Sequence, residues 1–369
     1  MITPATIASL VKVLIIGSLS FLIAFICAPL LIKFLYAKKM WRKSVRDKAI
    51  DGASVSNFQK FHSEGETSTP RMAGLLFWLP PLILAVLFYF LGTSDIPMLA
   101  KLNFWDRSQT WLPFFALIVA SLVGLADDLM QIYGHGKYIA GGLSLRYRLL
   151  VIGLMGFIGG WWMSHNLGWQ FIDIPFVGNF DLGWQTINLP WMGNVGFSLI
   201  YILFFIVVMM ATYSGGVIDG IDGLAGGSFL SMFAAFGVIA FVNNQINLAC
   251  FCFAIFGALL AFLWFNIPPA KFYMGETGSM GLCAAIAVVA FLTNSVMVLP
   301  IIGILLVLES GSVIIQLLSK KFRGKKVFLA APIHLHLEAI GWPPYSVTMR
   351  FWIIGILAAF LGVIIRIIG

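Results

Sequence analysis

Charged residues are scarce in this sequence. Asp, Glu, Lys and Arg together make up 10% of the 369 residues, whereas hydrophobic residues make up 60%. A water-soluble domain of this size needs more polar residues than this to cover its surface. The composition therefore excludes an ordinary soluble protein and indicates a chain whose solvent is the lipid bilayer.

Cysteine is also sparse. All four cysteines lie inside apolar stretches, and their spacing matches neither a disulfide framework nor a zinc site. We interpret them as small buried hydrophobic residues: Cys27, Cys250, Cys252 and Cys283. The short segments of alternating polarity that build a membrane β-barrel are absent as well, which leaves helices as the spanning elements.

What the sequence does contain is a series of apolar stretches long enough to cross a bilayer, which takes about 20 residues in a helix. Between Asp222 and Lys271, 48 residues carry no charge, enough for two helices joined at the polar residues 243–245. We predict an all-α membrane protein, a polytopic bundle of about ten transmembrane helices that forms a single domain over residues 1–369. The predicted spans are 13–32, 72–92, 110–126, 147–164, 196–213, 223–242, 247–265, 278–294, 297–319 and 350–367.

The basic residues predict how these spans are oriented. With ten spans, the loops on one side of the membrane carry 19 of the 23 Lys and Arg residues. Because cytoplasmic loops carry the excess of basic residues, we predict that this side is the cytoplasm and that both termini lie outside. The net charge of +8 is then explained by topology and attraction to anionic membrane lipid, and no nucleic acid partner is needed. The longest outer loop, 165–195, alternates apolar and polar residues and is expected to form an exposed hairpin.

Acidic residues and histidines collect on the same predicted side, at or near helix ends. Carboxylates beside apolar helices are costly and usually mark a functional path. Helix capping is the alternative, and for Asp222 alone the two explanations are equally good. For the whole set we favour one catalytic site formed by the cytoplasmic loops. The set comprises Asp127, Asp128, Asp219, Asp222, Glu276, His334, His336 and Glu338.

The chemistry of these residues favours phosphoryl transfer. At a helix end, the adjacent Asp127 and Asp128 can both reach a metal ion or a phosphate-bearing substrate. Magnesium prefers oxygen ligands and is often held by one or two carboxylates together with substrate phosphates, so we expect Mg²⁺ as the cofactor and disfavour zinc. Positive charge for a pyrophosphate would come from Lys271, His334, Arg146 and Arg148.

Two glycine-rich segments, 217–227 and 273–281, each precede an apolar helix. Glycine lets backbone N–H groups approach a phosphate, and the start of a helix favours an anion. For Gly226 and Gly227, close packing between helices is the favoured explanation.

Longer motifs resemble those of the polyprenyl-phosphate N-acetylhexosamine-1-phosphate transferases. The most extensive match runs from Glu309 to Trp352 and reads ESGSVIIQLLSKKFRGKKVFLAAPIHLHLEAIGWPPYSVTMRFW. Shorter matches follow the family's order, so the resemblance covers almost the whole chain. They are STPRMAG (68–74), GLADDLM (124–130), GLSLRYR (142–148), DGIDGLAGG (219–227) and FNIPPAKFYMGETGS (265–279).

The resemblance implies a multi-pass enzyme of the bacterial cytoplasmic membrane, with a magnesium-dependent cytoplasmic site and a homodimeric assembly. In this family's peptidoglycan branch, undecaprenyl phosphate attacks the sugar-linked phosphorus of UDP-N-acetylmuramoyl-pentapeptide and releases UMP. The product is the first lipid-linked intermediate of peptidoglycan synthesis, so the resemblance predicts this reaction for the chain.

Residue roles also follow from the matching motifs. Asp127 would be a base or an orienter of the lipid phosphate, and Glu276 stands at the family's magnesium-binding aspartate. The predicted catalytic residues are Asp127, Asp128, Glu276, His334 and His336, with Glu276 as the metal ligand. The predicted substrate-binding residues are Asn266, Asp219, Asp222, Lys271, Arg146 and Arg148.

Several positions depart from the family's pattern. Glu276 replaces an aspartate, and Leu335 interrupts a run of three histidines. Gln131 stands where a basic residue follows the acidic pair, and Gly216 stands where an asparagine is usual. Glu66 and Arg71 also differ from the usual loop.

Three alternatives stay open at this point. A sibling transferase would use UDP-N-acetylglucosamine, although the stretch APIHLHLEAIGWPP favours the muramoyl substrate. A lipid transporter would show internal repeats and a site in the middle of the membrane. We find no repeat, and Glu309, the only carboxylate well inside a predicted span, is better explained by a hydrogen bond between helices. An inactive relative that binds the nucleotide or the lipid is the third alternative.

Overall fold

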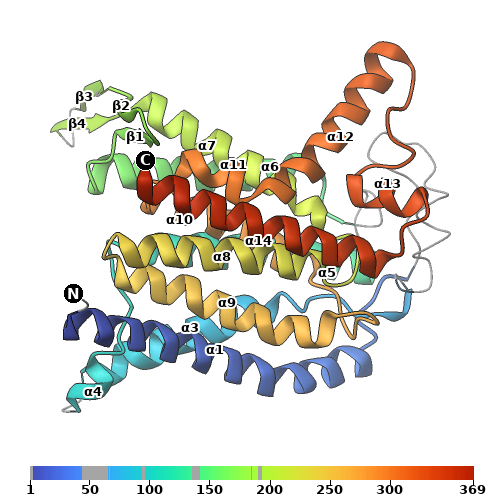
Figure 1. The fold of residues 1–369 in the computed structure, drawn as a ribbon, viewed down its shortest axis with the longest axis horizontal. Coiled ribbons are helices and arrows are strands. Elements are labelled where there is room, and N and C mark those ends of the chain that lie inside the picture. The colour runs from blue at the N-terminus through green and yellow to red at the C-terminus, as the bar shows by residue number, and fades with distance from the viewer. Residues whose placement is uncertain are drawn as a thin grey trace.

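The computed structural model describes residues 3–43, 65, 67–93, 96–134, 142–183, 185–189 and 193–369, and these form a bundle of long helices (Figure 1). The long helices are α1 (Pro4–Ala37), α3 (Leu75–Leu91), α5 (Trp111–Tyr133), α6 (Leu145–Asn166), α7 (Leu199–Ser214), α8 (Leu224–Val242), α9 (Ile246–Asn266), α10 (Gly275–Leu292), α12 (Ile304–Arg323) and α14 (Pro344–Ile368). Short helical segments are α4 (Pro97–Ala100), η2 (Gly215–Ile218), η3 (Val296–Val298), α11 (Leu299–Ile302) and α13 (Ile333–Ala339).

Each of the ten predicted spans overlaps one of these long helices, which confirms the all-α membrane class. Among the described residues, seven helices are long and apolar enough to cross a bilayer: α1, α5, α7 with η2, α8, α9, α10 and α14. The segment from η3 to α12 makes an eighth if it is one span, but it bends by 79°. Helix α3 is apolar but has only 17 residues, and α6 does not meet the same criteria. The count of ten spanning helices therefore stays a prediction.

Helix α10 is the centre of the bundle. All of its residues except Glu276 are buried. It packs along its length against α5 and also contacts α7, α8 and α3. Many of its residues are Gly, Ala, Ser or Thr, which allow neighbouring helices to approach closely. Glu276, at its start, is therefore the one side chain of α10 that other molecules can reach.

The outer helices have the opposite character. Helices α1 and α14 expose large apolar side chains such as Leu30 and Phe360. A bilayer explains this exposure, because hydrocarbon solvates such side chains while the backbone polar groups pair inside each helix. All four cysteines are free, three of them buried and Cys27 partly buried, which confirms their interpretation as small apolar residues.

The two ends of the bundle differ. One end carries both termini and two antiparallel strand pairs, while α13 lies at the other end (Figure 1). Strand β1 (Phe171–Ile174) pairs with β2 (Gly178–Asp181), and β3 (Gln185–Leu189) pairs with β4 (Gly193–Phe197). The structure thus has two strand pairs within residues 171–197, where a single hairpin was expected between residues 165 and 195. Arg366 of α14 binds Asp173 of β1 at 2.9 Å, which ties the end of the chain to this structure.

Helices α1 and α9 approach so closely that only glycine fits at one crossing point. A Cβ atom on Gly257 would overlap the backbone carbonyl oxygen of Gly17. Backbone atoms of two packed helices cannot move apart without disturbing the contacts around them.

We predict that Gly257→Ala lowers the free energy of unfolding by about 1–3 kcal/mol, the usual cost of overfilling a packed interior. Thermal unfolding of the purified protein in detergent measures this change. Gly311→Ala in α12 is the matched control, since a Cβ atom there meets nothing within 4 Å. Equal unfolding temperatures for the two variants would contradict the close packing of α1 and α9.

Candidate active site

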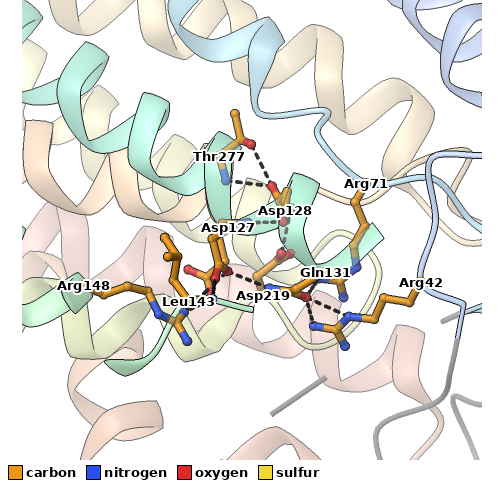
Figure 2. Close-up of polar contacts among 11 residues, drawn as sticks. Arg42, Arg71, Asp127, Asp128, Gln131, Leu143, Arg148, Asp219 and Thr277 are labelled. Atoms are coloured by element: carbon orange, nitrogen blue, oxygen red, sulfur yellow. Dashed lines mark hydrogen bonds and ion pairs between the residues drawn. The ribbon is translucent and has the colours of Figure 1, made fainter. Parts of the chain in front are cut away.

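Acidic residues from three separate segments meet near one end of the bundle. Asp127 and Asp128 lie near the end of α5, Glu276 lies in the first turn of α10, and Asp219 follows η2. Figure 2 shows these segments together with the guanidinium groups that surround them. The structure thus brings together four acids that are separated by up to 149 positions in the sequence.

Asp128 is bound to the start of α10. Its Oδ1 accepts a hydrogen bond from the N–H of Glu276 at 3.1 Å. Its Oδ2 accepts from the N–H of Thr277 at 2.9 Å and from the Thr277 hydroxyl at 2.7 Å (Figure 2). The first N–H groups of a helix have no partner within the helix, so Asp128 caps α10 although it belongs to α5. The position of Glu276 therefore depends on Asp128.

Glycines make this contact possible. A Cβ atom on Gly124 would overlap the carbonyl oxygen of Glu276, and one on Gly275 would overlap the carboxylate of Asp128. Gly275 also has a positive φ of 72°, a conformation that favours glycine. The glycines in GLADDLM and MGETG are therefore needed for the approach of two helices, which is a structural role.

Asp127 has different partners from its neighbour. Its Oδ2 accepts from Nε2 of Gln131 at 2.6 Å, and its Oδ1 accepts from the N–H of Leu143. Nη1 of Arg148 lies 3.8 Å from Oδ2 of Asp127 and 2.7 Å from Oε1 of Glu276. Asp127 and Glu276 thus share one guanidinium group. Asp127 is fully buried, whereas the Glu276 side chain remains 27% exposed.

Asp219, a residue that is partly exposed as a whole, adds a further carboxyl group. Its Oδ2 accepts from the N–H of Gly275 at 3.1 Å. Burial raises the pKa of Asp219 to about 7, while the positive charge of Arg71 acts in the opposite direction. A carboxyl group that titrates near neutral pH beside other acids is typical of a functional site.

Asn266 and Asp222 brace the loops around the acids. Oδ1 of Asn266 accepts from the N–H of Gly223 at 2.9 Å, and its Nδ2 donates to the carbonyl of Phe272 at 2.8 Å. Oδ2 of Asp222 accepts from the N–H of Ala270 at 3.0 Å. These bonds join the loop after η2 to the loop before α10. The contact with a nucleotide expected for both residues stays a prediction.

His334 forms a buried pair with Glu309. Its Nδ1 lies 2.8 Å from Oε2 of Glu309, and each side chain is 1% exposed. Among the described residues, Nε2 of His334 has no hydrogen-bond partner, and it faces Gly220, where a Cβ atom would overlap it. Burial opposes protonation of the ring, but the charge of Glu309 outweighs it and the pKa of His334 is raised. The pair gives Glu309 the interhelical hydrogen bond expected for it.

Three other predicted residues, His336, Lys271 and Arg146, form no hydrogen bond or ion pair with the four acids among the described residues. Nδ1 of His336 accepts from the N–H of Leu329 at 3.3 Å, and its ring packs against Phe328. The structure therefore separates the two predicted histidines. Lys271 and Arg146 are exposed at the surface. Within the part of the chain that the structure describes, no three His, Cys, Asp or Glu side chains are arranged to hold a metal ion. Glu66, named above as a departure from the family's pattern, lies outside the described residues.

Comparison with known proteins finds relatives that match most of this chain. Residues 110–294 match Glycosyl transferase family 4. A phospho-N-acetylmuramoyl-pentapeptide-transferase from a Geobacillus species is 35% identical over 350 residues, covering 95% of this chain and 96% of the relative. A protein of the same name from Levilactobacillus brevis is 34% identical, covering 81% of this chain and 85% of the relative. Another from Listeria welshimeri is 33% identical, covering 94% of this chain and 95% of the relative. The chain belongs to the phospho-N-acetylmuramoyl-pentapeptide-transferase family.

Membership in this transferase family confirms the resemblance found in the motifs. The segment that matches Glycosyl transferase family 4 contains the four clustered acids and Arg148. Glu309 and His334, which follow that segment, belong to the longest motif of the sequence.

Four polar residues of this site were not predicted as members, and one of them is Arg71, whose Nη1 lies 3.5 Å from Oε1 of Gln131. Arg42 donates to Oε1 of Gln131 from Nε at 2.8 Å, and Thr277 binds Asp128. Gln131 appeared in the sequence only as a departure from the transferase family's pattern. Gln131 lies four residues after Asp127, which places both side chains on one face of the helix. This spacing is the feature of the sequence that could have predicted their contact. No local pattern indicates that Arg42 reaches them.

We predict that Asp128→Asn lowers the free energy of unfolding by about 1–3 kcal/mol, because an amide offers one oxygen where three donors need acceptors. Thermal unfolding in detergent measures the loss. Asp181→Asn on the exposed strand β2 is the control and should change stability by less than about 0.5 kcal/mol. An Asp128→Asn variant as stable as wild type would show that the cap on α10 contributes little.

The pair of His334 and Glu309 predicts a pH-dependent stability. The raised pKa of His334 stabilises the fold fully below the unfolded value of about 6.5, and this contribution is lost as the pH rises through the folded pKa. Glu309→Gln should therefore cost most in unfolding temperature near pH 6 and less at alkaline pH, as measured between about pH 5.5 and 9. In a His334→Asn background this pH dependence should disappear. A cost that does not vary with pH would contradict a charged pair.

Proposed function

We propose that this protein transfers phospho-N-acetylmuramoyl-pentapeptide from its UDP-linked form to undecaprenyl phosphate, releasing UMP and forming the first lipid intermediate of peptidoglycan synthesis. The observation that carries the proposal is the cluster of carboxylates and guanidinium groups near one end of a membrane helix bundle. A lipid phosphate and a nucleotide can meet at such a place. The proposal is supported by relatives named phospho-N-acetylmuramoyl-pentapeptide-transferase that align with 94–95% of this chain.

In the proposed reaction, an oxygen of the lipid phosphate forms a bond to the sugar-linked phosphorus, and the bond from that phosphorus to UMP breaks. Asp127 would orient the attacking lipid phosphate, because Gln131 and the N–H of Leu143 hold its carboxylate in place. Arg148 lies between Asp127 and Glu276 and would balance the charge that passes between the substrates. Nε2 of His334, which faces the loop of Asp219 and Gly220, would contact the nucleotide sugar.

We also propose that Mg²⁺ takes part in the reaction. The oxygens of Asp128 are occupied by donors of α10, and no three possible metal ligands converge among the described residues. These facts do not favour an ion enclosed by protein side chains alone. They fit an ion held by one or two carboxylates together with substrate phosphates. Glu276, which is partly exposed, and Asp219 are the residues that would hold it, and the ion would neutralise charge on the departing phosphate.

The orientation in the membrane is part of the proposal. The site would face the cytoplasm and both termini would lie outside, supported by the 19 of 23 basic residues on the predicted inner side. The separation of the termini from α13 in Figure 1 is consistent with this orientation. The homodimer implied by the resemblance stays a prediction.

The test is UMP release by the purified protein in detergent with undecaprenyl phosphate and Mg²⁺. Release with UDP-N-acetylmuramoyl-pentapeptide and not with UDP-N-acetylglucosamine, together with a lipid-linked product, supports the proposal. A chelator should stop the release, and added Mg²⁺ should restore it. Release with UDP-N-acetylglucosamine would select the sibling activity, and no release by folded protein with either nucleotide would overturn the proposal.

Two variants make this test specific to the site. We predict that Arg148→Ala lowers kcat by about 10²–10³, the usual effect of removing one group that stabilises charge in a transition state. Lys101→Ala, an exposed residue among the few basic residues on the predicted outer side, should keep wild-type activity. Equal activity of the two variants would remove Arg148 from the mechanism.

A further inference from the structure

Gln131 lies between two arginines and Asp127. Its Oε1 accepts from Nε of Arg42 at 2.8 Å, from a terminal nitrogen of Arg42, and from Nη1 of Arg71 at 3.5 Å. Its Nε2 donates to Oδ2 of Asp127 at 2.6 Å. Figure 2 shows this series of contacts from the two guanidinium groups through the amide to the carboxylate.

Both Gln131 and Arg42 are buried, with exposed fractions of 5% and 3%. A buried guanidinium group is costly unless its charge is offset and its donors are satisfied. The amide of Gln131 accepts from cations at one end and donates to an anion at the other. Both ends polarise the amide in the same direction, which strengthens each hydrogen bond. The positive charge of Arg42 therefore acts on Asp127 through the neutral amide of Gln131.

The arginines come from distant parts of the chain. Arg42 follows α1 and lies 89 positions before Gln131, and Arg71 lies 60 positions before it. A basic side chain at position 131 would reach Asp127 directly, because residues four positions apart on a helix are neighbours. In this chain the same positive charge is supplied by Arg42 in the segment after α1 and by Arg71 in the segment before α3.

We propose that Gln131 is a relay that couples Arg42 to Asp127, and that Arg42 is thereby a positioning residue for phosphoryl transfer. The relay fixes Oδ2 of Asp127 toward Gln131. Because Oδ2 of Asp127 is fixed in this way, the orientation of its carboxylate relative to Arg148 is fixed as well. This inference rests on the proposed function, because it assigns Arg42 a part in the same reaction.

Four proteins test the relay: wild type, Arg42→Ala, Gln131→Lys and the double variant, each assayed for UMP release with kcat and KM separated. Arg42→Ala should lower kcat by about tenfold, the size of coupling usual within one polar network. Gln131→Lys alone places an ammonium group beside Arg42 and Arg71 and should also lower kcat. In the double variant the ammonium group of the lysine replaces the positive charge of Arg42 and lies next to Asp127. The kcat should then return to within about threefold of wild type.

The controls separate charge from packing. Lys33→Ala, an exposed basic residue near the same end of α1, should keep wild-type kcat. Arg42→Lys should keep more activity than Arg42→Ala. If Arg42 only joins α1 to α5, the double variant will be no more active than Arg42→Ala, which overturns the relay. Wild-type kcat in Arg42→Ala also overturns it.

The outcome is distinguishable from failure of the proposed function. If wild type releases no UMP, the proposed function fails, and the relay is then decided by the unfolding temperatures of the same four proteins. A double variant more stable than Gln131→Lys and Arg42→Ala supports charge coupling between the two positions. Purely additive losses of stability overturn it.

Discussion

The carboxylate of Asp128 joins α5 to the first turn of α10, and the arrangement of the site depends on this contact. It fixes the backbone of Glu276 and Thr277 by accepting three hydrogen bonds. Glu276 then meets Arg148 at 2.7 Å, while the preceding N–H, that of Gly275, binds Asp219. The hydrogen bonds of this buried carboxylate thus set the backbone from which Glu276 reaches Arg148, next to the N–H that binds Asp219.

Burial of charge divides the acids of this protein into two groups. Asp127, Asp128 and Glu309 are at most 1% exposed, and each is held by hydrogen bonds or an ion pair. Such pairing is what allows ionisable groups to persist inside an apolar bundle. Glu276 and Asp219 keep partial exposure. The buried acids are therefore held in fixed positions within the site, and Glu276 and Asp219 are its more exposed carboxylates.

The sequence alone predicts the helices of the bundle well, because the length of an apolar stretch can be read from consecutive residues. All ten predicted ranges overlap a long helix, although the bend between α11 and α12 was not predicted. The site is less predictable. Asp127 and Asp128 are adjacent and chemically identical, so only the packing of α10 distinguishes their roles. His334 and His336 stand two positions apart on the short helix α13, which turns them in different directions.

The central claim is that Asp128 holds the start of α10. Hydrogen–deuterium exchange tests it most directly, by comparing wild type with Asp128→Asn across the amides of residues 275–279 under conditions in which both proteins are folded. Selective loss of protection in these amides, with α8 and α9 unchanged, is the predicted result. Equal protection in the two proteins would contradict the claim and would show that α10 is held at its start by packing alone.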